Sequence, residues 1–209
     1  LFTQVMQPMP LPPRTPPQAI AASEFILGGQ KSGKSRRAEW LARDWLGTSP
    51  QHHAVLLATG QAWDDEMRER ITRHQRDRAE RVPGLATVEV PLYLADAIRT
   101  HSRANTLLVV DCLTLWLTNW LMPVEEFEQN VPPAHSSPAQ IAMLLEAIQQ
   151  APGPVVLVGN EIGLGVIPMG REVRAFVDAL GRLNQDVAAV CSRVTLMAAG
   201  LPLTLKEPG

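Results

Sequence analysis

The sequence predicts an α/β fold in which a mostly parallel sheet is flanked by helices. Short apolar runs alternate with segments of helical periodicity along most of the chain, the pattern expected of strand–helix–strand units. A glycine-rich loop joins the first apolar run to the first helical segment. The length of 209 residues, with 45% hydrophobic and 19% charged residues, suits one globular domain with a sizeable core.

Seven apolar runs are expected to form the strands of this sheet. The last one follows a Gly-Leu-Pro turn at 200–202 and is expected to close the sheet as a short strand. The expected strands are residues 24–27, 54–58, 86–90, 106–110, 155–158, 194–198 and 203–206.

Helical periodicity fills the segments between these runs. In residues 36–46 the apolar side chains recur three and four residues apart on one face, and Gly47 is expected to end this helix. Ser137 and Pro138 are expected to cap a later helix, with proline at its first position. The first apolar face consists of Ala38, Leu41, Ala42, Trp45 and Leu46, and a long buried stripe in the last helix consists of Val173, Phe176, Val177, Leu180, Val187 and Cys191.

Two segments are expected to lie outside the sheet and its helices. Residues 1–23 are rich in proline and are expected to be a disordered or loosely docked extension, so the domain spans 24–209. Residues 122–138 contain four prolines and several acids and are expected to form a surface loop.

Composition excludes several function classes. A net charge of −2 does not favour a nucleic-acid partner. No apolar run approaches the ~18 residues that a membrane span needs. Cys112 and Cys191 stand in apolar surroundings and are expected to be buried thiols of a reducing, cytoplasmic protein. His52 and His53 have no acid or cysteine at metal-ligand spacing and are expected to be structural.

The glycine-rich loop has the complete G-x-x-x-x-G-K-S pattern of a phosphate-binding loop, or P-loop. Between a strand and a helix N-terminus, its backbone N–H groups and the helix dipole face an anion. Lys34 would reach the outer phosphates and Ser35 would offer a hydroxyl to Mg²⁺. The sequence therefore predicts a nucleoside triphosphate site. Its residues are Gly28, Gly29, Gln30, Lys31, Ser32, Gly33, Lys34 and Ser35.

Asp111 is the candidate carboxylate for the metal. It follows four aliphatic residues at the end of the strand expected over 106–110, where P-loop enzymes place an acid near Mg²⁺. The alternative role is an N-cap for the helix that begins near Leu113, because aspartate is also a good capping residue.

His74 is the candidate nucleophile. It lies on a segment over 64–78 that begins with acids and ends with bases, as a helix dipole favours. Met67 and Ile71 share its face, and Arg70 and Arg78 lie four residues to either side. A lone histidine on a helix is more often a solvated residue. Two neighbouring arginines would bind phosphate and disfavour the imidazolium, which keeps the ring nucleophilic.

The loop at 159–168 is a further candidate site. It is rich in glycine, contains Asn160 and Glu161, and follows the strand at 155–158. Open α/β sheets bind ligands at the carboxyl ends of their strands, although a plain connecting loop is the alternative.

Together, these segments resemble the adenosylcobinamide kinase / adenosylcobinamide-phosphate guanylyltransferase family of cobalamin biosynthesis. The likeness covers nearly all of residues 25–206. It is carried by GGQKSGKS at 28–35, LLATGQAWDDEMRERITRHQRDR at 56–78, TVEVPL at 87–92, VVDCLTLWLTN at 109–119, GNEIGLGVIP at 159–168 and GRLNQ at 181–185.

The resemblance implies a RecA-like P-loop fold, a homotrimer and two activities on a corrinoid substrate. The first activity phosphorylates adenosylcobinamide with ATP or GTP. The second transfers GMP from GTP to the product through a guanylyl-histidine and releases pyrophosphate. By position, His74 corresponds to the nucleophile. Further nucleotide contacts correspond to Ala58, Thr59, Gly60, Gln75, Arg76, Asp77, Arg78, Glu89 and Asp111.

Two other functions share the P-loop. A RecA-like module that uses nucleotide to bind nucleic acid or a partner would need a basic groove with interleaved aromatic residues. A simple small-molecule kinase would use His74 only as a phosphate contact. Covalent labelling by GTP distinguishes these alternatives from the bifunctional enzyme.

Overall fold

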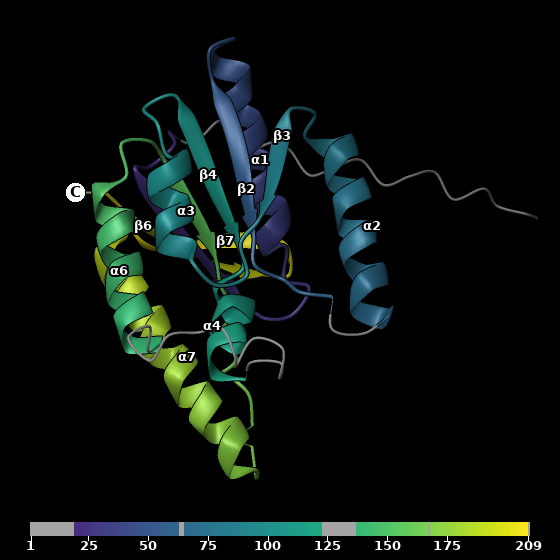
Figure 1. Ribbon diagram of the computed structural model, residues 1–209, viewed down its shortest axis with the longest axis vertical. Coiled ribbons are helices and arrows are strands. Elements are labelled where there is room, and N and C mark those ends of the chain that lie inside the picture. The colour runs from purple at the N-terminus through teal and green to yellow at the C-terminus, as the bar shows by residue number, and fades with distance from the viewer. Residues whose placement is uncertain (1–18, 63–64, 123–136, 167, 209) are drawn as a thin grey trace, which may run out of the picture.

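The computed structural model describes residues 19–62, 65–122, 137–166 and 168–208, apart from the side chain of Arg70. The described chain forms a seven-stranded sheet with helices on both faces (Figure 1), which confirms the predicted α/β class. Its elements are β1 (Ser23–Gly28), α1 (Lys34–Thr48), β2 (His53–Ala58), α2 (Asp65–Arg81), β3 (Leu85–Glu89), α3 (Leu94–His101), β4 (Thr106–Asp111), α4 (Leu113–Leu121), α6 (Ser137–Gln150), β5 (Val155–Val158), α7 (Arg171–Val190), β6 (Arg193–Ala198) and β7 (Leu201–Lys206).

The strand order is β3-β2-β4-β5-β1-β6-β7. Strands β1 to β6 all pair in parallel, and β7 pairs antiparallel with β6. The closing strand is therefore confirmed, although it begins at Leu201, two residues earlier than predicted. Because the parallel strands share one direction, their carboxyl ends meet at one edge, where the P-loop also begins.

Alternating side chains of the central strands supply two separate cores. In β4, Leu108 and Val110 pack into the core beneath α3, α4, α6 and α7, whereas Leu107 and Val109 pack into the core beneath α1. This alternation is the two-residue period of a strand buried on both faces. The apolar face predicted for α1 lies on its core, with Ala38, Leu41 and Ala42 buried and Trp45 and Leu46 packed against them.

Helix ends differ by a few residues from the prediction. Gly47 does not end α1, which continues to Thr48, where the hydroxyl donates to the Trp45 carbonyl oxygen at 2.7 Å. That side-chain bond stabilises the last turn without a glycine in the left-handed conformation. Helix α6 begins at Ser137, one residue before the predicted start, so Pro138 is its second residue.

The stripe predicted along α7 is buried only in its C-terminal half. Leu180 and Val187 are fully buried, and Cys191 is buried just beyond the helix, whereas Val173 is 50% exposed. The cause is visible in Figure 1, where the first turns of α7 extend past the end of the sheet. No strand lies beneath these turns, so an apolar side chain at 173 has no core to enter.

The expectations for the two outlying segments fall mostly outside the described residues. Residues 1–18 and 123–136 belong to them. In the described part of the extension, Ala21 is buried and the Ala19 carbonyl oxygen accepts a hydrogen bond from Arg193 at 2.8 Å. Among the described helices, none combines the length and apolar character needed to cross a membrane.

The two cysteines are buried as predicted, and His52 packs against an aromatic ring. Cys112 and Cys191 are free and buried, and burial raises the pKa of the first thiol to about 11 and of the second to about 12. The ring of His52 stacks on Trp45 with centroids 3.8 Å apart. His53 is the first residue of β2, rather than part of the predicted loop.

Candidate functional site

The P-loop has the strand-to-helix geometry that the motif requires. Strand β1 ends at Gly28 and α1 begins at Lys34, after Gly33 in the left-handed conformation with a φ of 103°. A Cβ on Gly28 would lie 2.5 Å from both the Met197 carbonyl oxygen and Ser32 Oγ. Glycine is therefore needed at 28 for space and at 33 for backbone conformation.

Two side chains inside the loop are prepared for an anionic ligand. Lys34 is 8% exposed and its Nζ donates to the Gly29 carbonyl oxygen at 2.7 Å. Burial lowers its pKa, while the neighbouring Cys112 and Asp111 oppose that change. Ser32 Oγ is buried and has no hydrogen-bond partner among the described residues. A phosphate group would give both side chains the partner that they need.

Register places three predicted nucleotide contacts in one row at the carboxyl edge of the sheet. Ala58 at the end of β2 pairs with Glu89 of β3 on one side and with Asp111 of β4 on the other. Asp111 in turn pairs with Val158 of β5, the strand that separates β4 from β1. The sheet therefore brings the P-loop and this row of residues to the same edge.

Asp111 does not cap the helix that follows it. The residue at the N-cap of α4 is Cys112, and no side chain makes a capping hydrogen bond there. Asp111 is instead the last residue of β4, and its charge acts on the buried Lys34. The capping alternative is wrong, and the carboxylate remains available to a metal or a phosphate-bound water.

Replacing Asp111 with asparagine should lower activity without lowering stability. Because no cap depends on this carboxylate, we expect the melting temperature of Asp111→Asn to change by no more than about 2 °C. We expect kcat to fall at least roughly 100-fold if the carboxylate supports the reacting phosphates. The matched control is Asp44→Asn on the exposed side of α1. Normal activity with a large drop in melting temperature would contradict this role.

Thr59 holds the turn after β2 from inside the molecule. It is 0% exposed, and its hydroxyl donates to the Cys112 carbonyl oxygen at 2.7 Å and accepts from the Cys112 N–H at 2.8 Å. Its own carbonyl oxygen accepts from Asn119 Nδ2 at 2.9 Å. The side chain therefore joins the turns after β2 and β4 inside the molecule.

His74 lies on the face of α2 that is turned toward the domain. Successive residues are about 100° apart around a helix, so His74 lies inside the arc of about 80° between Arg81 and Ile71. Both ends of that arc contact the domain: Ile71 Cδ1 lies 4.0 Å from the position of a Cβ on Gly60, and Arg81 pairs with α1. His74 nevertheless is exposed. Its side chain is therefore accessible to solvent on the side of α2 that is turned toward the domain.

The predicted phosphate contact of Arg78 beside His74 stays a prediction, because without a nucleotide this side chain faces Glu39. Arg78 is 9% exposed, and its Nε lies 3.9 Å from Oε1 of Glu39 on α1. Arg81 Nη1 lies 2.9 Å from Oε2 of the same carboxylate. Burial raises the pKa of Glu39, against the opposing effect of Arg81 and Arg78. These arginines fasten α2 to α1, so they do not neutralise a phosphate beside His74 in this conformation.

The predicted contacts after the nucleophile do not all share its face. Gln75 and Arg76 are exposed, and Arg76 points about 160° away from His74 around the helix. Asp77 lies 3.4 Å from Arg81 in an ion pair one turn along α2. His74 and Arg76 therefore lie on nearly opposite faces of α2.

The loop after β5 is held to the P-loop by a backbone hydrogen bond and to α4 and α7 by side chains that sequence reasoning missed. The Glu161 N–H donates to the Gly28 carbonyl oxygen at 3.1 Å. The Asn160 N–H donates to Thr114 Oγ1 at 2.9 Å, and its carbonyl oxygen accepts from Asn184 Nδ2 at 3.1 Å. The available signal for Asn184 was an amide within the apolar stripe of α7, because a buried amide needs a partner.

The residues expected to hold Mg²⁺ offer suitable donors. Ser35 lies in the first turn of α1, and Asp111 is close enough to Lys34 to affect its pKa. A hydroxyl and a carboxylate are the oxygen ligands that Mg²⁺ prefers, with phosphates and water completing the octahedron. Among the described residues, no group of three or more His, Cys, Asp or Glu side chains forms a separate metal centre.

The chain matches a known protein family over most of its length. Residues 24–205 match the family model described as cobinamide kinase / cobinamide phosphate guanyltransferase. A bifunctional adenosylcobalamin biosynthesis protein CobP from Pseudomonas aeruginosa is 44% identical, with 88% of this chain and 98% of that protein covered. The bifunctional CobU proteins of Escherichia coli and Salmonella typhimurium are 37% and 34% identical, each with 87% of this chain and 98% of that protein covered.

A solved structure agrees at the level of the fold. The flagellar accessory protein FlaH from Methanocaldococcus jannaschii superposes with a TM-score of 0.50, covering 90% of this chain and 80% of that one. The sequence identity is 13%, so this likeness concerns the fold alone.

Proposed function

The chain belongs to the cobinamide kinase / cobinamide phosphate guanyltransferase family, and we propose that it performs both reactions at its single P-loop. In the first reaction a hydroxyl of adenosylcobinamide takes the γ-phosphoryl group of ATP or GTP. In the second, the resulting phosphate takes GMP from GTP, and pyrophosphate leaves. The corrinoid is thus the acceptor in both reactions.

The P-loop supplies what phosphoryl transfer requires, which is mainly position and positive charge. Its backbone N–H groups and the N-terminus of α1 face the β- and γ-phosphates, and Lys34 neutralises charge that develops between them. Mg²⁺ bound by Ser35 and Asp111 would supply further positive charge to the phosphates. The unpartnered Ser32 Oγ is the observation within the loop that most favours a bound phosphate.

Guanylyl transfer is proposed to use His74 as a covalent carrier. A ring nitrogen attacks the α-phosphorus of GTP, the bond to the β-phosphate oxygen breaks, and pyrophosphate leaves with the electron pair. An oxygen of cobinamide phosphate then attacks the same phosphorus, and the P–N bond breaks. The observation that carries this proposal is the exposed His74 on the domain-facing side of α2, between residues that contact Gly60 and α1.

The phosphates of a bound nucleotide would have to compete with Glu39 for Arg78 and Arg81, which now form ion pairs with it. Arg78 is a predicted phosphate contact, yet it is buried against Glu39 at 3.9 Å. A triphosphate is a stronger partner for a guanidinium than a distant carboxylate, because it accepts charge-assisted hydrogen bonds on several oxygens. We therefore propose that Arg78 exchanges Glu39 for phosphate when GTP binds.

The family resemblance also implies a homotrimer, which light scattering would measure.

The experiment that tests the proposed function is incubation of the purified chain with α-labelled GTP and Mg²⁺, without a corrinoid. We expect the label to stay on the denatured protein through an acid-labile, base-stable P–N bond, with release of one pyrophosphate per label. Adding cobinamide phosphate should then remove the label as cobinamide-GDP. A simple kinase would acquire no label from the α-position, so an unlabelled protein would contradict the covalent mechanism.

A further inference from the structure

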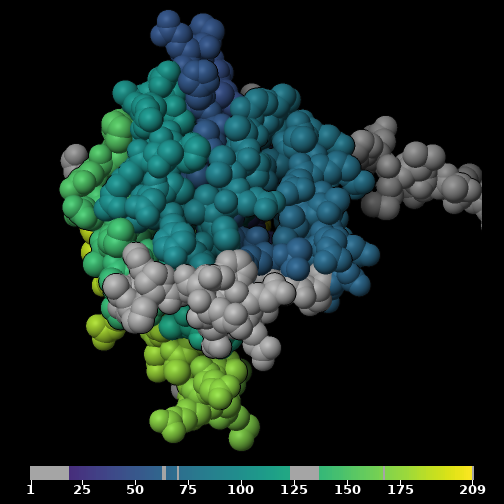
Figure 2. Space-filling model, viewed as in Figure 1, coloured from purple at the N-terminus to yellow at the C-terminus, as the bar shows by residue number. Residues whose placement is uncertain are grey.

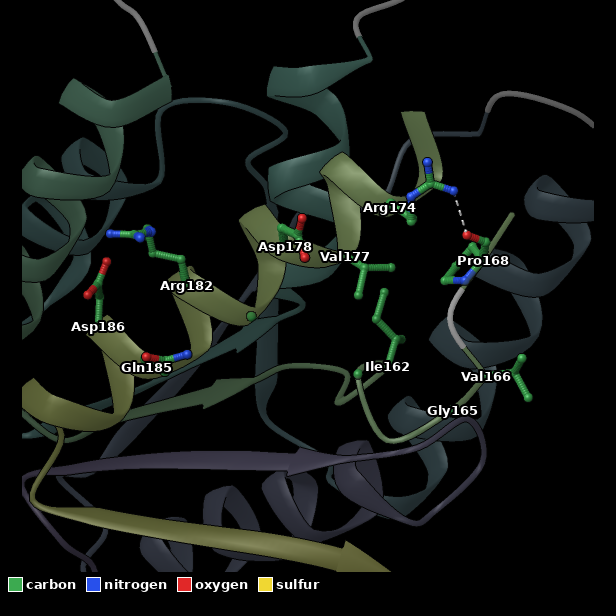
Figure 3. A pocket seen from close by; sticks show the side chains of 12 residues that line it. Ile162, Gly165, Val166, Pro168, Arg174, Val177, Asp178, Arg182, Gln185 and Asp186 are labelled. Atoms are coloured by element: carbon green, nitrogen blue, oxygen red, sulfur yellow. Dashed lines mark hydrogen bonds between the residues drawn. The ribbon is translucent and has the colours of Figure 1, made fainter. Parts of the chain in front are cut away.

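A pocket between α7 and the candidate loop at 159–168 has no ligand assigned to it so far. It has a volume of about 510 Å³ and lies between the loop that follows β5 and one face of α7 (Figure 3). From the loop it is lined by Ile162, Val166 and Pro168, and from the helix by Val177 and Gly181 among others. Ile162 lies opposite Val177 across this space (Figure 3).

The helix wall carries charged side chains of both signs, three of which have no partner among the described residues. Arg174, Asp178, Arg182 and Asp186 follow one another at intervals of four residues and line the pocket, so they form one stripe along α7. Arg174 donates to the carbonyl oxygen of Pro168 at 3.0 Å. The side chains of Asp178, Arg182 and Asp186 make no ion pair or hydrogen bond with any described residue. The stripe carries two guanidinium groups as donors and two carboxylates as acceptors, so it has no net charge.

Large apolar side chains in the pocket's loop and just before Arg174 are exposed, and one of them, Val166, lines the pocket. Leu164 is 80% exposed, Val166 is 95% exposed, Met169 is 96% exposed and Val173 is 50% exposed. They belong to the loop and to the first turns of α7, which project beyond the rest of the molecule (Figures 1 and 2). Exposed apolar groups gathered around a pocket mark a binding site more often than scattered single ones do.

This pocket begins next to the P-loop. Its first lining residue, Ile162, directly follows Glu161, whose N–H donates to the carbonyl oxygen of Gly28 at 3.1 Å. The α7 wall of the pocket is held to the loop after β5, because Asn184 of α7 donates to the Asn160 carbonyl oxygen at 3.1 Å. The pocket is therefore built on the loop that is attached to the P-loop at the carboxyl edge of the sheet.

We propose that this pocket binds the corrinoid acceptor, an inference that rests on the proposed function. A corrinoid is a broad ring with apolar faces and a rim of neutral amide side chains, which both donate and accept hydrogen bonds. Apolar loop residues match its faces, and the alternating Arg and Asp side chains match its amides. A nucleotide is a poorer match, because the stripe has as many carboxylates as guanidinium groups. The open pocket would hold one edge of the ring and direct its hydroxyl-bearing arm toward the P-loop.

Gly181 allows a test that leaves the fold intact. It lies within α7 and lines the pocket, and a Cβ added to it would meet no atom within 4 Å. Gly181→Phe therefore fills the pocket, and Gly181→Ala is the matched control that adds a single methyl group. Both replacements favour the helix over glycine. Cobinamide binding can be measured by equilibrium dialysis, using the visible absorbance of the corrinoid.

We expect Gly181→Phe to raise the Kd and KM for cobinamide at least tenfold, with an unchanged KM for GTP and unchanged labelling by α-labelled GTP. Gly181→Ala should behave as the original chain. As a second variant, Arg182→Gln should raise the KM for cobinamide, whereas Arg171→Gln, on the same helix but outside the pocket, should not. Unchanged cobinamide binding in Gly181→Phe would overturn the proposal.

Activity of the original chain distinguishes a failure of the pocket inference from a failure of the proposed function. If the original chain phosphorylates cobinamide and Gly181→Phe does so equally well, the pocket inference fails and the proposed function stands. If the original chain neither binds nor phosphorylates cobinamide, the proposed function itself fails. Light scattering of each variant tests the other occupant, a second copy of the chain: a changed number of subunits in Gly181→Phe would make this face an interface and overturn the proposal.

Discussion

Lys34→Ala is expected to depress phosphorylation and guanylylation together. One P-loop serves both reactions in the proposed function, and Lys34 is its only buried cation, with Nζ held 2.7 Å from the Gly29 carbonyl oxygen. Removing it takes away charge that stabilises the transferring phosphates in each transition state. We expect a loss of about 3 kcal/mol in each, which is roughly 100-fold in kcat/KM.

The measurement is steady-state kinetics of both half-reactions on the same preparation. Arg43→Ala removes a cation from the same helix at a site 41% exposed, and its activities should remain normal. Folding of Lys34→Ala is checked by its melting temperature, because a buried ammonium that burial disfavours contributes little to stability. Guanylylation that survived the loss of phosphorylation would require a second nucleotide site, and the one-site proposal would fail.

His74→Ala is expected to abolish guanylylation and to spare phosphorylation. Transfer of GMP through a covalent carrier cannot proceed without its nucleophile, so both the protein-bound label and cobinamide-GDP should disappear. Transfer of the γ-phosphoryl group to a hydroxyl needs no histidine, so cobinamide phosphate should still form at a rate within about threefold of the original. The substitution is at an exposed helical position, where alanine does not weaken the helix.

His53→Ala is the matched control, since His53 is also exposed but lies at the start of β2, the end of the strand far from the P-loop edge. Phosphoramidate chemistry gives a further readout, because label on histidine is lost in acid and kept in base. Label that persists in His74→Ala, or that maps to another histidine by peptide sequencing, would overturn the assignment.

The sequence determined those features that are encoded within a few consecutive residues. The P-loop could be read directly, because its glycines at 28 and 33 each satisfy a local demand of space or backbone conformation. The strands at 106–110 and 155–158 were evident from unbroken aliphatic runs, and the buried face of α1 from its helical period. Boundary errors at Gly47 and Ser137 arose where single side-chain bonds or neighbouring segments decide where a helix begins or ends.

Only the tertiary structure decided which of these pieces meet. No local pattern reveals that β5 lies between β1 and β4, or that Ala58 stands in register with both Glu89 and Asp111. The sequence does not show which way the arginines of α2 face. In the folded chain Arg78 lies against Glu39 of α1, an acid to which the sequence alone assigned no role. The pocket on α7 likewise joins a loop to a helix wall that begins some ten residues later. Periodicity fixes which face of an element is apolar, but the partner of that face depends on long-range packing, which no short stretch of sequence encodes.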